Sequence, residues 1–133
     1  YRGIKSIRRC YDEAYLSALF ANQNVIYYSS IDTIKLLYPL KDDDVIQQYY
    51  DKTIKKLEEY DKKNGTDLLE TLETYLKYNL KKTLVAEKLF IHVETLRYRL
   101  NRIEEITGYS LEDTEGLFAL QMGLIIKKLL EIK

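Results

Sequence analysis

The sequence has few of the residues that cross-link a chain or interrupt its secondary structure. Its single cysteine, Cys10, cannot form an intramolecular disulfide and suits a reducing cytoplasm. One proline and five glycines force few breaks. No apolar run approaches the ~18 residues of a membrane span, and no signal-peptide pattern is present. These absences argue against a disulfide scaffold and a membrane protein, and they predict a cytoplasmic location.

Groups suited to catalysis or to cofactor binding are also scarce. His92 is the only histidine, and the sequence has neither Cys/His metal spacing nor a glycine-rich phosphate loop. Glu104 and Glu105 are adjacent on a predicted helix, with no sign of a desolvated pocket. The acidic run 42–44 fits a helix N-terminus better than a metal site, because consecutive carboxylates point in different directions. We therefore expect no enzyme activity, no cofactor and no metal.

Charge is abundant but unevenly distributed. Charged residues make up 32% of the chain, and 21 bases balance 21 acids. Residues 42–75 carry ten acids against five lysines, a net of −5, whereas residues 77–102 carry seven bases against two acids, a net of +5. A local basic stretch is what a phosphate backbone would attract. Charge alone does not establish nucleic-acid binding, so the stretch has to be placed on a scaffold.

Apolar spacing predicts a mainly α fold, a helical bundle with one short strand near the N-terminus. The strand is "VIYY" at Val25–Tyr28, which is β-branched and aromatic. The 3.6-residue period predicts helices over residues 6–22, 30–38, 45–60, 67–79, 82–90, 93–107 and 114–132.

Capping residues mark several of these helix ends. Asp67 followed by Glu70 predicts a capping box at the start of the fourth helix. Gly108 is expected to end the sixth helix, and Asp113 to cap the seventh. The two residues "IH" between the fifth and sixth helices leave room only for a sharp turn.

The sixth helix separates an apolar stripe from a polar face. At ~100° per residue, Leu96, Leu100 and Ile103 share one side. Arg99 falls near the edge of that stripe, where an ion pair with Glu87 is an alternative to an external contact. A short helix, a tight turn and such a helix are the arrangement of a helix-turn-helix, whose second helix reads base edges in the major groove. The candidate DNA contacts on this recognition helix, about residues 92–107, and the preceding helix are Lys82, His92, Val93, Glu94, Thr95, Arg97, Tyr98, Asn101 and Arg102.

The tract "LLETLETYLKYNLKKTLVAEKLFIHVETLRYRLNRIEEITG" resembles the C-terminal helix-turn-helix domain of PucR/CdaR-type bacterial transcriptional regulators. The resemblance rests on a leucine-rich helix, an "A-x-x-L" helix, the string "H-x-x-T-L-x-Y-R-L" and a closing "I-x-x-x-T-G". It implies a DNA-binding domain over residues 63–133. Residues 1–62 resemble more loosely the tail of the GGDEF-like domain that precedes this module, followed by a helical linker. The chain departs from the family pattern at Val93 and Glu94, where members often carry a basic and an amide residue.

The resemblance implies double-stranded DNA as the partner and control of transcription as the function. An inducer, if there is one, is expected to bind an upstream domain that this chain does not include. The alternative is a helical interaction or sensing domain whose helix-turn-helix no longer binds DNA, which the zero net charge and Glu94 favour. Because one neutral module should bind a duplex poorly, we expect a homodimer on a palindromic site, with strand Val25–Tyr28 of two chains pairing.

Overall fold

The structure is a computed structural model that describes residues 28–132. All regular structure within this range is helical, as the sequence predicts for a mainly α fold. The helix predicted over residues 6–22 and most of the predicted strand lie outside the described range. Tyr28, the last residue of that strand, instead begins a helix. The elements are α2 (Tyr28–Leu37), the 3-10 helix η1 (Tyr38–Leu40), α3 (Asp44–Thr53), α4 (Lys55–Asn64), α5 (Leu68–Lys77), α6 (Lys82–Leu89), α7 (Val93–Thr107) and α8 (Thr114–Glu131).

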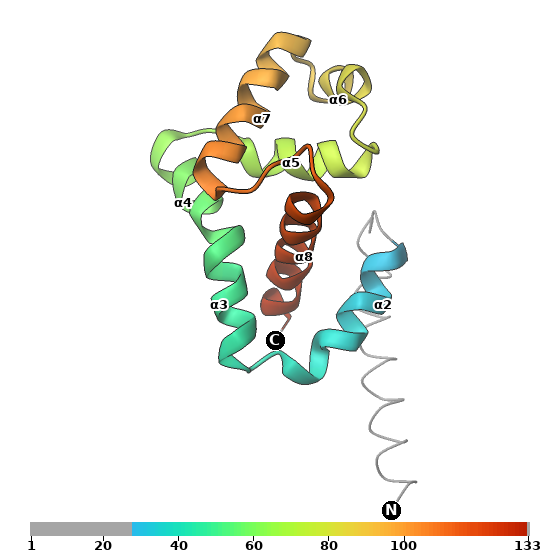
Figure 1. Cartoon of the computed structure of the whole chain (residues 1–133), viewed down its shortest axis with the longest axis vertical. Coiled ribbons are helices and arrows are strands. Elements are labelled where there is room, and N and C mark those ends of the chain that lie inside the picture. Colours follow the sequence, from blue (N-terminus) through green and yellow to red (C-terminus); the bar gives the residue numbers. More distant parts are fainter. Residues whose placement is uncertain (1–27, 133) are drawn as a thin grey trace, which may run out of the picture.

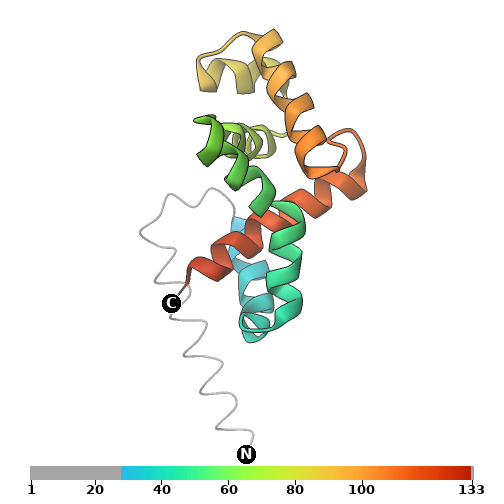
Figure 2. The ribbon, with the colours of Figure 1, turned by 90° about the vertical axis from the view of Figure 1, so that its left-hand side faces the viewer.

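The helices are arranged around α8, which packs against both α3 and α2 (Figure 1). Helix α5 packs against α4, α6 and α7. Helices α6 and α7 form the end of the described structure that lies farthest from η1 (Figures 1 and 2). No helix in the described range is both long and apolar enough to cross a membrane. The arrangement therefore presents α6 and α7 at one end of a helical support.

Two apolar clusters hold the helices together. The smaller one joins α2 and α3 to the C-terminal half of α8 and consists of Ile34, Ile46, Ile126, Leu129 and Ile132. The larger one underlies α4–α7 and consists of Ile54, Leu57, Leu68, Leu72, Tyr75, Leu76, Val85, Ala86, Leu96, Leu100, Ile103, Leu111, Leu120 and Leu124. Because α8 contributes to both clusters, it couples the α6–α7 end to the rest of the chain.

The prediction of a single helix over residues 45–60 is wrong. The chain bends at Ile54 and forms the two helices α3 and α4 instead. Helix α8 crosses α3 closely here: a Cβ added to Gly123 would lie 2.4 Å from Thr53 Oγ1. Across the bend, the Tyr50 hydroxyl donates to Glu58 Oε1 at 2.5 Å. Burial and this hydrogen bond raise the pKa of Tyr50, so the hydroxyl remains a donor. Tertiary packing thus overrides a local periodicity that would continue the helix.

Helix caps are only partly those predicted. Asp43, within the predicted acidic cap, accepts from Val45 N at 2.9 Å, and Asp113 accepts from Gly116 N at 2.6 Å. The prediction of a capping box at Asp67 is wrong, since the Asp67 side chain makes no cap hydrogen bond. The first amides of α5 are instead satisfied by Asp61, a residue of the preceding helix. Its carboxylate oxygens accept from Leu68 N and Leu69 N, each at 2.9 Å.

Candidate nucleic-acid interface

Helix α7 lies on α5 and α6 through the apolar stripe that the sequence predicts. Leu96, Leu100 and Ile103 are all buried in the larger cluster. Gly108, in the left-handed conformation at φ 78°, ends the helix as expected. Since the stripe fixes the rotation of α7 about its axis, the opposite side of the helix faces outward (Figure 1).

A three-residue turn connects α6 to α7. Phe90 caps α6 in the left-handed conformation at φ 57°, and Ile91 N donates to Ala86 O at 3.0 Å, which reverses the chain. His92 is the N-cap of α7, in extended conformation and without a side-chain cap hydrogen bond. Two helices joined by such a turn, with the second on a third helix, form the helix-turn-helix geometry.

The outward face of α7 carries three of the predicted contacts close together. The side chains of Glu94 and Arg97 are 81% and 58% exposed, and Arg97 Nη1 donates to Glu94 Oε1 at 3.0 Å. Tyr98 is 67% exposed. An exposed ion pair of this kind is weak in water, so both partners can exchange it for other contacts.

Lys82 and Asn101 join Arg97 at a shallow depression of about 230 Å³. Lys82 lies at the start of α6, and Arg97 and Asn101 lie on α7, so the depression brings the start of α6 beside the middle of α7. Lys82 makes no ion pair within the described range. Glu104 and Glu112 border the same depression and reduce its positive charge.

The remaining residues at the start of α7 differ in their surroundings. His92 and Thr95 are exposed. Val93 is half-buried and packs against the larger cluster, so it contributes to the support of α7 as well as to its first turn.

Arg102 has a structural partner on another helix. Its guanidinium lies 5.1 Å from the centroid of the Tyr60 ring on α4, and its Nε donates to the Tyr60 hydroxyl at 3.1 Å. Its Nη1 also donates to Glu105 Oε2 at 2.6 Å. The hydrogen bonds to Tyr60 and Glu105 raise the pKa of Arg102, and the side chain is held towards α4.

Arg99 does not form the ion pair with Glu87 that the sequence suggests as an alternative. Its Nη1 donates instead to Thr71 Oγ1 on α5 at 3.2 Å. The half-buried position at the edge of the stripe is as expected, but the partner is a buried hydroxyl 28 residues earlier in the chain. Arg99 thus ties α7 to α5.

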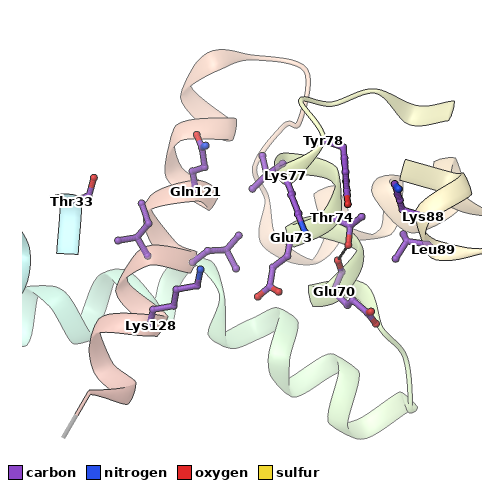
Figure 3. Close-up of a pocket in the computed structure, with 13 residues that line it drawn as sticks. Thr33, Glu70, Glu73, Thr74, Lys77, Tyr78, Lys88, Leu89, Gln121 and Lys128 are labelled. Atoms are coloured by element: carbon purple, nitrogen blue, oxygen red, sulfur yellow. Dashed lines mark hydrogen bonds between the residues drawn. The ribbon is translucent and has the colours of Figure 1, made fainter. Parts of the chain in front are cut away.

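A larger cavity of about 380 Å³ lies away from α7, between α5, the end of α6 and α8 (Figure 3). Acidic Glu70 and Glu73 and basic Lys77, Lys88 and Lys128 line it, over an apolar floor. No residue of α7 contributes to the lining. Within the described residues, no group of three potential ligands is placed to hold a metal ion.

Comparison with known proteins identifies the α5–α8 region. Residues 68–126 match the family described as the PucR C-terminal helix-turn-helix domain. The chain is 34% identical over 107 residues to the proline-responsive transcriptional activator PutR of Bacillus subtilis, a match that covers 80% of this chain and 26% of that protein. It is 29% identical over 116 residues to the purine catabolism regulatory protein of B. subtilis, covering 87% and 21%. No solved structure gives a significant match.

A shorter match joins the chain to the carbohydrate diacid regulator of Escherichia coli, with 38% identity over 61 residues, 46% of this chain and 16% of that protein. The chain therefore spans no more than about a quarter of the length of these three relatives. All three are named as regulators of transcription or metabolism, and the matched region contains the turn and both helices described above. Residues 68–126 therefore form a PucR-type C-terminal helix-turn-helix domain, and the chain is similar in sequence to transcriptional regulators of the PucR/CdaR type.

Proposed function

We propose that the chain binds duplex DNA sequence-specifically, with the first turns of α7 in the major groove and the start of α6 on the backbone. The observation that carries this proposal is the cluster of Lys82, Arg97 and Asn101 around one depression, on a helix whose rotation is fixed by three buried residues. Side chains on a rigid element can be matched to base edges without a large loss of entropy.

Each polar group on this surface has a chemically suitable target. A guanidinium such as that of Arg97 can donate two hydrogen bonds to guanine O6 and N7, and an amide such as that of Asn101 can pair with adenine. Glu94 can accept from the amino group of cytosine. The ammonium of Lys82 suits a phosphate. In the uncomplexed chain the Glu94–Arg97 ion pair holds two of these groups together, so DNA binding requires them to separate.

The proposed set of DNA contacts also includes His92, Val93, Thr95, Tyr98 and Arg102. His92 and Thr95 stand at the entrance of the helix, where an uncapped N-terminus favours a phosphate oxygen. Arg102 would reach DNA only by leaving Tyr60, so we assign it a secondary part.

The proposal extends to assembly and domain organisation. Because the chain has no net charge, a single copy should bind a duplex weakly. Two copies on a palindromic site would add their contacts and bind more tightly. Residues 63–133 would be the DNA-binding domain, and residues 1–62 the end of a GGDEF-like domain with a helical linker. An inducer site, if present, would belong to an upstream domain. We place the protein in the cytoplasm, where its DNA target is.

The test is a titration of the whole chain with fluorescent duplex DNA at several salt concentrations, followed by selection from random duplexes. Engagement of the backbone should make the logarithm of the affinity fall with log salt, with a slope of about 0.9 per phosphate neutralised. Selection should recover a symmetric sequence. Failure to enrich any sequence, together with a salt slope near zero, would refute the proposal.

The second candidate, a domain whose helix-turn-helix no longer binds DNA, is favoured by one feature. Of the three arginines on α7, Arg97, Arg99 and Arg102, each already has an intramolecular partner. The selection experiment decides between the two, because only a DNA-binding domain enriches a sequence.

A further inference from the structure

Phe90, in the turn between α6 and α7, is the most exposed of the large apolar side chains in the described range. Its exposed fraction is 94%. Its backbone has the left-handed conformation, and its N–H is directed back to the carbonyls of Ala86 and Glu87. This conformation turns the ring out from the bundle, while the adjacent Leu89 and Ile91 pack against the larger cluster.

Within the described residues, Phe90 belongs to neither apolar cluster, so packing does not explain a phenylalanine here. A positive φ disfavours residues with a Cβ, and glycine or asparagine would occupy the turn with less strain. A ring this exposed also gains no burial. A single exposed apolar side chain is ordinary on a protein surface. An exposed aromatic ring that also requires a disfavoured backbone conformation calls for a partner outside the chain.

The position of Phe90 favours DNA as that partner. It stands two residues before His92, the N-cap of α7, and so beside the turns proposed to enter the major groove. It also lies within residues 77–102, where seven bases oppose two acids. The occupant of this surface is therefore expected to be anionic, which fits a duplex better than a second neutral copy of the chain.

Most of the bases in residues 77–102 already have intramolecular contacts, which leaves part of the affinity for DNA to other groups. Lys77 and Lys88 lie 5.3 and 5.6 Å from the centroid of the Tyr78 ring, and the arginines of α7 have partners of their own. Each of these cations must give up an internal contact to neutralise a phosphate. An apolar contact at Phe90 has no such competitor, because the ring is already solvent-exposed.

We propose that Phe90 contacts the C5-methyl group of a thymine in the major groove, at the edge of the sequence read by α7. The proposal rests on the proposed function. A phenyl ring has no donor or acceptor for a base edge, and the thymine methyl is the apolar group that the major groove offers to such a side chain. The contact would select thymine at one position next to the bases read by Arg97 and Asn101.

The test uses the whole chain and the duplex that the wild-type protein enriches from a random pool. Each thymine is replaced in turn by deoxyuridine, which lacks only the methyl group. At one thymine, the replacement should weaken wild-type binding about fourfold, the value for one buried methyl. Phe90→Ala should bind the unmodified duplex about tenfold more weakly. It should also be insensitive to deoxyuridine at that thymine.

Two further variants control for folding and for general exposure of aromatics. Phe90→Asn keeps a residue that tolerates the left-handed conformation, so it should fold and lose the same affinity. Phe118→Ala removes another exposed ring, on α8, and should bind like the wild-type protein. Circular dichroism of each variant should match that of the wild type.

The outcomes separate this proposal from the proposed function. Wild-type enrichment with unchanged affinity of both Phe90 variants overturns only the contact at Phe90. Equal sensitivity of wild type and Phe90→Ala to every deoxyuridine overturns the thymine assignment. A Phe90→Ala variant that changes sedimentation but not affinity places the ring in a protein interface and also overturns it. Absence of any enriched sequence refutes both proposals.

Discussion

The Arg102 guanidinium lies over the ring of Tyr60, 5.1 Å from its centroid, and joins the candidate recognition helix to α4. The contact is completed by the hydrogen bond from Arg102 Nε to the Tyr60 hydroxyl. An arginine that the sequence places among the DNA contacts is therefore also a support for the helix that carries them. Arg97, five residues earlier on the same helix, is hydrogen-bonded instead to the exposed side chain of Glu94.

This difference predicts that Arg102→Ala affects stability as well as binding. The variant loses the Tyr60 and Glu105 contacts, so its midpoint of thermal unfolding should fall below that of the wild type. Tyr60→Phe removes only the hydroxyl and should cause a smaller fall. Differential scanning calorimetry of both variants measures the effect. Equal midpoints for wild type and Arg102→Ala would show that the contact contributes nothing to stability in solution.

Arg97→Ala should have the opposite profile. Its side chain is off the buried stripe, so the unfolding midpoint should stay within experimental error of the wild type. Loss of a base or phosphate contact should weaken DNA binding by ~1–3 kcal/mol. Fluorescence anisotropy with the selected duplex measures the affinity. Unchanged affinity in a correctly folded variant would remove Arg97 from the interface.

The buried stripe of α7 gives a third prediction. Leu96→Ala or Leu100→Ala should lower the free energy of unfolding by ~2–5 kcal/mol, because each leaves a cavity in the larger cluster. Urea denaturation followed by circular dichroism measures it. Thr95→Ala, at an exposed site on the same helix, is the control and should change stability little. An unchanged free energy of unfolding in Leu96→Ala would contradict the position of Leu96 in the larger cluster.

The sequence predicts the parts of this site that depend on local periodicity. The stripe of Leu96, Leu100 and Ile103 and the end of α7 at Gly108 follow from spacing and from glycine's conformational freedom. The exposed position of Arg97 follows from the same helical wheel. Each of these features is decided within a few residues along the chain.

The features that the sequence did not predict depend on tertiary contacts or on one backbone dihedral. The partner of Arg102 is 42 residues away, on a helix whose own start was not predicted. Spacing from Ala86 puts Phe90 near the inward side of a continued α6, and only the left-handed reversal turns it outward. The bend at Ile54 lies where Gly123 of α8 approaches Thr53 and Ile54, a contact between residues about 70 positions apart.

The first amides of α5 are capped by the side chain of Asp61 and not by that of Asp67, which gives a fourth prediction. Asp61→Ala removes the acceptor of two main-chain amides and of the Thr66 hydroxyl, so it should lower the free energy of unfolding by ~1–2 kcal/mol. Asp67→Ala is the matched control, at the N-cap position but without a side-chain cap bond, and should cost only a few tenths of a kcal/mol. Urea denaturation of both variants decides. A larger loss of stability in Asp67→Ala than in Asp61→Ala would show that Asp67 is the cap in solution.

The crossing of α3 and α8 gives the last prediction. A Cβ at Gly123 would lie 2.4 Å from Thr53 Oγ1 and 2.8 Å from Ile54 Cγ1, and both residues are buried. Gly123→Ala gains up to ~1 kcal/mol in helix propensity but should lose ~1–3 kcal/mol through overpacking, so a net loss of stability is expected. Pairing it with Thr53→Ala removes the closest atom.

The double variant should therefore be more stable than the sum of the two single changes predicts, with a coupling of at least ~0.5 kcal/mol. Thermal or urea unfolding of the four proteins in this cycle measures the coupling. Additive effects would show that α3 and α8 separate without cost at this point. Because α8 shares both apolar clusters, a loosened crossing should also lower the stability of the α6–α7 end, visible as faster amide hydrogen exchange at Leu96 and Leu100.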